Sequence, residues 1–296
     1  METELGKAYV QVIPSAKGIG GMLKKSMGGD MDSAGTSLGK GLGSKIKAAI
    51  IAAGIGKVLK TAIFEGAKLE QSLGGVETLF KGSAGRVKKY AAEAYRTAGM
   101  SGNEYMENVT SFSAAMISSL GGNTKKAAKL SNQAITDMSD NANKMGTDLS
   151  MVTQTYQSLA RGQYQMLDNL KLGYGGTKGE MQRLLNDAEK LTGKKYDISS
   201  FSDVTQAIHA IQTQMGITGT TAKEAASTIS GSFNMMKSAA KDFLGNLTLG
   251  RDVSKSMENL VTSTGTFLSN LLPALGNIAK GLVNVIGTTF PQMFSK

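Results

Sequence analysis

The chain contains no cysteine and a single histidine, His209, among its 296 residues. The absence of cysteine excludes a disulfide framework, a thiol nucleophile, a thiolate zinc site and an iron–sulfur cluster. One imidazole cannot form a two-histidine metal motif, and a serine triad would have to use His209 as its base. We therefore expect no enzyme activity, and no catalytic, cofactor-binding or metal-binding residues.

Proline is scarce, whereas glycine is abundant. Pro14, Pro273 and Pro291 are the three prolines, against 37 glycines. Disordered linkers usually carry both residues, and proline is the residue that stops helices most firmly, so this balance favours helices punctuated by glycine. Aromatic residues make up 6% of the chain and charged residues 19%, which leaves few fillers for a dense interior. We predict an all-α fold of extended or loosely bundled helices, with a Gly-rich N-terminal leader and no compact single core.

The net charge of +10 is concentrated near the start of the chain, where residues 1–90 hold 14 basic and 7 acidic side chains. Such an excess favours an anionic partner, which leaves nucleic acid, a lipid surface and an acidic protein wall open beside a simple solvated face. No aromatic stacking platform accompanies the basic residues, so we expect no sequence-specific binding of nucleic acid.

Composition divides the chain into four segments. Residues 1–45 form a Gly-rich basic leader, and 46–82 an apolar, small-residue helix with a linker. Residues 83–250 form a helical body, and 251–296 an apolar C-terminal helical segment.

Helix starts and apolar spacing organise the body. Capping-box patterns begin at Ser101, Thr177, Ser200 and Thr221. Apolar residues three and four apart predict helices at Val109, Phe112, Met116 and Leu120; at Ile208, Ile211 and Met215; and at Ile229, Phe233, Met236, Ala240 and Phe243.

A further stripe runs from Ile135 to Leu159 with the spacing of a coiled-coil seam. Gly146 lies inside that run and is a candidate break, with Thr147 as a new N-cap. The Gly- and Asn-rich stretch Leu167–Gly176 is predicted to be a long turn.

Two apolar segments are candidates for contact with a membrane or with another helix. Ile46–Leu73 is a helix candidate whose uncharged centre is too short to span a bilayer. Asn259–Ala279 holds no charged residue but is diluted by polar side chains, which cost free energy in hydrocarbon. A helix that needs a protein partner is favoured in both cases, and membrane insertion of 46–64 or 259–290 stays open.

The remaining motifs that could bind a ligand or catalyse a reaction are weak candidates. Gly39-Lys40-Gly41 lacks the glycine and hydroxyl that a phosphate-binding loop requires, so we reject it. His209 is expected to be a packed or surface histidine. The carboxylate pairs are expected to lie on solvated polar helix faces: Asp137 with Asp140, and Asp187 with Glu189.

Three blocks of sequence resemble the tail tape measure proteins of phages that infect Gram-positive bacteria. The opening ELGKAYVQVIPSAKGI is similar to the start of those proteins. Residues 140–191 (DNANKMGTDLSMVTQTYQSLARGQYQMLDNLKLGYGGTKGEMQRLLNDAEKL) and 221–250 (TAKEAASTISGSFNMMKSAAKDFLGNLTLG) resemble the body of the same family.

This resemblance implies a structural protein of the virion tail, or of a prophage or tail-like particle, made in the host cytoplasm. Such a protein lies in the tube lumen, sets tube length, and leaves at infection to aid DNA passage. The implied partners are the tail tube protein, tail assembly chaperones, distal tail proteins, other copies of its helices and, transiently, the host membrane. A fully helical chain of this length would span about 440 Å.

The chain differs from the family in its length, and a second function stays open. Members of this family are commonly much longer, so the chain is either a short complete tape measure or a truncated one. The alternative is a membrane-active helical protein, such as a pore-former or secreted toxin, motivated by the two apolar segments.

Overall fold

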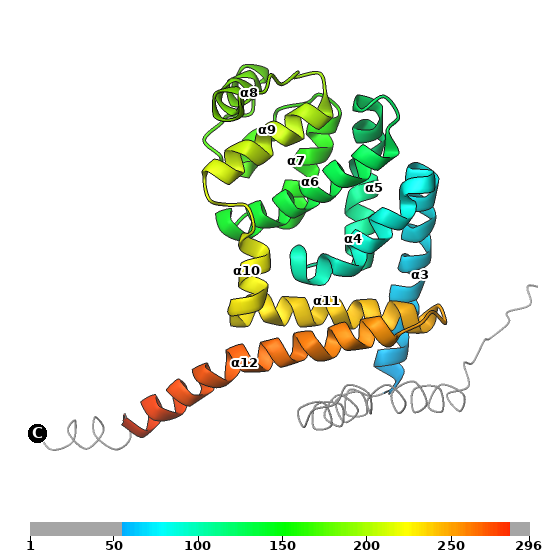
Figure 1. Cartoon of the computed structure of the whole chain (residues 1–296). Helices are drawn as coiled ribbons and strands as arrows, with labels where there is room; N and C mark the ends of the chain where they lie inside the picture. Colours follow the sequence, from blue (N-terminus) through cyan, green and yellow to red (C-terminus); the bar gives the residue numbers. More distant parts are fainter. Residues whose placement is uncertain (1–54, 285–296) are drawn as a thin grey trace, which may run out of the picture. The chain divides into compact units, whose positions relative to one another are not determined.

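The computed structural model describes residues 55–284, with side chains described for 60–278 and for 280. The described residues belong to a single compact unit. Within them the secondary structure is helical, with no strand, so the predicted all-α class is confirmed (Figure 1). The Gly-rich leader and Gly39-Lys40-Gly41 lie outside the described residues.

Most of the helices follow one another through short turns, whereas the longer stretch 161–177 joins α7 to α8. Their bounds are α3 Ile55–Phe80, α4 Ala84–Thr97, α5 Gly102–Ser119, α6 Thr124–Met145, α7 Leu149–Ala160, α8 Lys178–Thr192, α9 Phe201–Gln214, α10 Thr220–Ser227, α11 Ile229–Thr248 and α12 Ser254–Asn284, with 3-10 turns η1 at Lys81–Ser83 and η2 at Leu167–Leu170.

Three of the four expected capping residues cap a helix. Ser101 and Glu104 form a reciprocal capping box at α5, while Thr177 and Ser200 accept hydrogen bonds at the starts of α8 and α9. The prediction at Thr221 is wrong, because α10 begins at Thr220 and its N-cap is Gly219, two residues before the predicted cap. A glycine has no side-chain acceptor, so the start of α10 needs an acceptor from elsewhere in the fold.

Gly146 ends α6 in the left-handed conformation, with φ 62°, and so breaks the seam expected from Ile135 to Leu159. The residue that caps α7 is Asp148, whose carboxylate accepts from the Ser150 N–H, and not Thr147. Thr147 donates instead to the Asn169 carbonyl. Because α6 and α7 fold back on each other, the stripe is divided between two packed helices.

The first described helix is longer than its sequence pattern suggested. It was expected to end at Leu73, yet α3 continues through Gly74 to Phe80. Val76 and Phe80 are fully buried, so the last turns contribute to the interior. Residues 46–54 of that helix candidate lie outside the described residues.

One continuous hydrophobic core joins α3 to α9, so the prediction of no compact single core is corrected for this part of the chain. Its largest fully buried side chains include Tyr105, Tyr156, Phe112 and Met106. Phe112 packs edge-on against Phe201, with ring centroids 5.8 Å apart. Methionine and alanine fill the space that a low aromatic content seemed to leave, because flexible and small side chains adapt to irregular gaps.

The predicted long turn at Leu167–Gly176 is confirmed, since it holds η2 and no α-helix. Leu167 and Leu170 are nevertheless fully buried, so this turn is anchored in the core.

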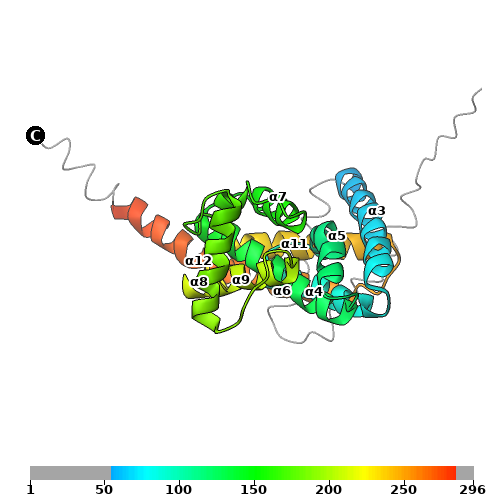
Figure 2. The same cartoon turned by 90° about the horizontal axis from the view of Figure 1, so that it is seen from above.

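Helices α11 and α12 form a layer of their own beside α3 and α4 (Figures 1 and 2). Its buried residues Met235, Phe243 and Leu260 are not members of the main core. The last part of α12 projects past the start of α11 (Figure 1). No helix within residues 55–284 is long and apolar enough to cross a membrane.

Close packing of α11 against α10 depends on glycine at Gly231, where a Cβ atom would lie 2.4 Å from the Glu224 carbonyl oxygen. We expect Gly231→Ala to lower the free energy of unfolding by about 1–3 kcal/mol, because the backbone of one helix would have to shift. Urea unfolding followed by circular dichroism measures the change.

The matched control is Gly74→Ala, in the middle of α3 with nothing within 4 Å of the added Cβ atom. There alanine should stabilise the protein by about 0.5–1 kcal/mol through its helix propensity. Equal effects at both positions would contradict the close approach at Gly231.

Candidate functional site

The two carboxylates of α6 lie inside the protein. Asp137 and Asp140 are 1% and 0% exposed, so the expectation of a solvated polar face is wrong for this pair. Helix α6 contacts α4, α5, α7, α9 and α10, and its polar residues face neighbouring helices as well as water. The other expected pair does lie at the surface, where Asp187 accepts from Lys190 at 2.9 Å.

Asp137 pairs with the single histidine of the chain. Nδ1 of His209 on α9 lies 2.8 Å and 3.0 Å from the two carboxylate oxygens of Asp137. Burial raises the pKa of Asp137 to about 6, and the hydrogen bond to Asp137 raises the pKa of His209. His209 is therefore a packed histidine, as expected, but one that is oriented by a buried acid.

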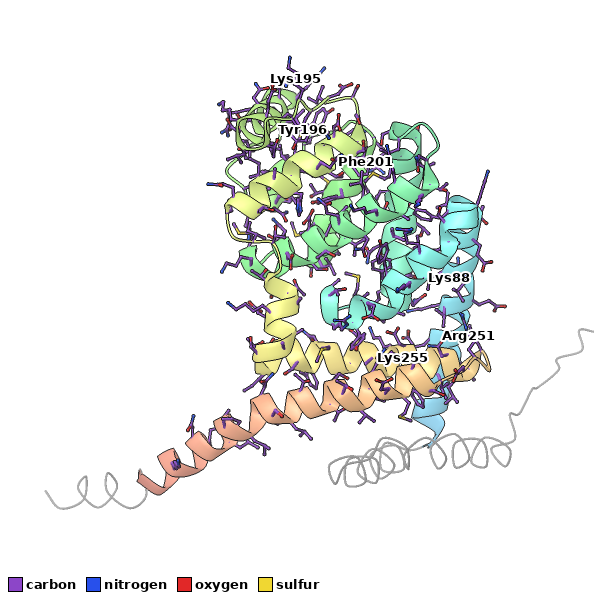
Figure 3. The ribbon with its side chains drawn as sticks, in the orientation of Figure 1. Lys88, Lys195, Tyr196, Phe201, Arg251 and Lys255 are labelled. Carbon is purple, nitrogen blue, oxygen red and sulfur yellow. The ribbon has the colours of Figure 1, made fainter. Side chains whose placement is uncertain are left out.

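The exposed edge of His209 contributes to a groove of about 490 Å³ beside α9. The lining combines amides and hydroxyls, among them those of Gln133, Gln206 and Tyr196, with the apolar side chains of Leu191 and Ala210. Tyr196 comes from the loop between α8 and α9 (Figure 3). These groups can donate and accept hydrogen bonds, and within residues 55–284 no cluster of three His, Asp or Glu side chains could hold a metal ion.

Asp140 supplies the acceptor that Gly219 lacks. Its two carboxylate oxygens accept from the backbone N–H groups of Gly219 at 2.6 Å and Thr221 at 2.8 Å, across about 80 residues of sequence. A carboxylate at a helix N-terminus also interacts favourably with the helix dipole. Asp140 therefore caps α10 from a distant part of the chain.

A second long-range carboxylate joins α11 to α5. Asp242 accepts from the Gly102 N–H at 2.7 Å, and the neighbouring Lys241 forms an ion pair with Glu104. Burial raises the pKa of Asp242 to about 7, and the nearby carboxylates Glu104 and Glu65 add to that rise. The layer of α11 and α12 is thus attached to the body through ionisable groups.

The largest exposed apolar side chains of α12 lie in its last turns. Leu272, Leu275 and Ile278 are 62%, 49% and 59% exposed. Just before them, the Asn270 side chain donates to the carbonyls of Ala226 and Thr228 at 3.2 Å, which fixes α12 against the start of α11. Past that point the helix has an apolar face with no partner among the described residues.

Sequence reasoning proposed no catalytic residue, placed Asp140 on a solvated helix face, and did not name Asp242. The sequence did indicate that a distant acceptor is needed, because Gly219 has no side chain with which to cap the helix that follows it. Asp242 had no such signal, since the Gly102 N–H that it caps follows Ser101, which already supplies a local cap.

No protein-family model, curated protein or solved structure matches the chain.

The strength of the buried pair can be measured with Asp137→Asn, His209→Gln and the double variant. We expect a coupling free energy of about 1–3 kcal/mol at neutral pH, because the change at His209 removes the ionic partner of the buried Asp137 carboxylate. Urea unfolding of the four proteins gives the value.

The same cycle on Lys194 and Asp203, an exposed pair 3.2 Å apart, is the control and should give less than about 0.5 kcal/mol. Additive effects at Asp137 and His209 would show that the pair contributes nothing to the fold.

Asp242 should make stability depend on pH. Its pKa is raised from 3.8 to about 7 on folding, so the folded state binds the proton more tightly. Its contribution is complete below about pH 4 and is lost as pH rises through about 7. We therefore expect Asp242→Asn, which keeps the acceptor for Gly102, to be more stable than the parent at pH 8 by about 1–3 kcal/mol, a range reduced because the residue keeps some solvent contact.

The two proteins should converge near pH 4 in urea titrations across the range. Asp148→Asn is the control, since Asp148 is an N-cap whose pKa is lowered by Ser150 and asparagine caps about as well. A constant difference between parent and Asp242→Asn at all pH values would contradict the assignment.

Proposed function

We propose that the chain is a phage tail tape measure protein, which sets the length of the tail tube and leaves the tail at infection. The proposal rests on the three resembling sequence blocks. Its partners are then the tail tube protein, tail assembly chaperones, distal tail proteins and further copies of the chain, and its place is the lumen of the tube.

The structural observation that carries the proposal is α12. It is a single helix of 31 residues, about 46 Å long, and its last part leaves the body with apolar side chains exposed. A ruler needs axial rise and lateral partners, and a long helix with an unpaired apolar face offers both.

The folded body limits which part of the chain can contribute to the measured length. Helices α4 to α9 fold back on one another around a shared core, so the length of about 440 Å expected of an extended chain does not apply to them. We therefore assign the body to one end of the measured length, and the length itself to helices that project from it.

Tail length tests this assignment directly. Two additional tandem copies of residues 262–279 would add 36 helical residues, so we expect tails about 54 Å longer. Averaged negative-stain images of particles carrying the altered gene measure the change.

The control is an insertion of equal length in the exposed loop between α8 and α9, near Gly193, which should leave tail length unchanged. Unchanged tails with the α12 insertion would overturn the ruler role.

The second candidate is a membrane-active protein of the pore-forming or toxin-like kind. The uncharged run Asn259–Ala279 and the exposed leucines of α12 favour it. Leakage of liposomes by the purified protein at physiological salt, together with its absence from phage particles, would replace the first proposal with this one.

A further inference from the structure

The apolar face of α12 is one stripe with two different environments. Leu260, Thr264, Phe267 and Leu271 recur at helical spacing, and Ala274, Leu275 and Ile278 continue the same stripe. Leu260 is buried, and the Phe267 ring contacts Phe233 of α11 at a centroid distance of 5.3 Å.

The partner helix stops before the stripe does. Helix α11 runs antiparallel to α12 and begins at Ile229, beside Asn270, where α10 turns away (Figure 1). Leu275 and Ile278, only one to two turns further along, are about half exposed. The stripe of α12 that packs against α11 therefore continues past the start of α11, where α11 no longer covers it.

Charge indicates what can fill that position. No charged residue lies between Asn259 and Ala279, although the whole chain carries +10. A partner selected by electrostatic complementarity would find nothing to recognise on this face. A second copy of the same helix meets it with the same neutral stripe and without like charges opposed across the contact.

We propose that the last turns of α12 pair with the same turns of a second copy in an antiparallel, two-fold symmetric dimer. The second helix then follows the direction of α11 and takes the position beyond its start, with Leu275 of one chain near Ile278 of the other. A parallel copy on this face would run into α11 of the first chain. Such a contact is isologous, so it closes on two chains.

This pairing specifies the self-association within the proposed function. It is measured on the purified protein, whereas the ruler role is measured on tails, so the failure of one is distinguishable from the failure of the other. Because the contact is small, we expect a dissociation constant on the order of 10 μM.

Light scattering after size exclusion, with sedimentation equilibrium, tests the dimer in the full chain. At about 100 μM, well above that dissociation constant, the mass should approach twice the 31.0 kDa of one chain. Higher salt should favour the dimer, because it screens the repulsion between two chains of net charge +10. A mass of one chain at this concentration overturns the proposal.

Charge reversal on the stripe gives the decisive variants. We expect Leu275→Glu/Ile278→Glu and Leu275→Lys/Ile278→Lys each to be monomeric, and their equimolar mixture to regain the dimer. Only pairing of this face with itself predicts that recovery. If each variant alone remains dimeric, or the mixture remains monomeric, the pairing is wrong.

Ser269→Glu/Gly276→Glu is the matched control, because it adds the same charge on the opposite side of the same turns. Nothing lies within 4 Å of a Cβ atom at Gly276, so the change is sterically free. It should keep the parent mass, and circular dichroism should show the same helix content and thermal midpoint for all variants. Loss of the dimer in this control would overturn the assignment to the stripe.

Discussion

Capping of a helix by a carboxylate from a distant part of the chain is the interaction on which the arrangement of this protein depends. Asp140 of α6 holds the first turn of α10, whose own N-cap, Gly219, has no side chain to do so. The direction of α10 in turn sets where α11 begins, and α11 supports the first half of α12. A contact in the middle of the body thus positions the helix that leaves it.

The attachment of the outer layer repeats this principle at a second place. Asp242 of α11 caps the start of α5 while Lys241 binds Glu104, so charged hydrogen bonds add to the packing of α11 against α3. Hydrogen bonds to ionised groups are stronger than neutral ones, but a buried carboxylate remains costly to desolvate. The layer is consequently held by directional, titratable contacts in addition to the packing of α11 against α3.

The separation between the core of α3 to α9 and the layer of α11 and α12 fits a protein that combines a folded body with a projecting helix. Buried methionine, alanine and tyrosine give the body its stability without a dense aromatic interior. No described residue of α12 belongs to that core, and past Leu271 its uncharged face exposes Leu275 and Ile278. The His209 groove, in contrast, is lined by neutral amides and hydroxyls together with Leu191 and Ala210, and the buried Asp137 joins α6 to α9 through His209.

The sequence by itself determined the helical class, the capping box at Ser101, the break at Gly146 and the turn before Thr177. All of these depend on residues a few positions apart, whose hydrogen bonds and backbone preferences are local. Only the tertiary structure decided that the helices share one core, that Asp140 and Asp242 cap helices about 80 and 140 residues away, and that α12 outruns its partner helix. The physical reason is that burial and capping over such distances depend on which helix faces meet, and residue spacing along one helix does not encode the identity of the helix opposite.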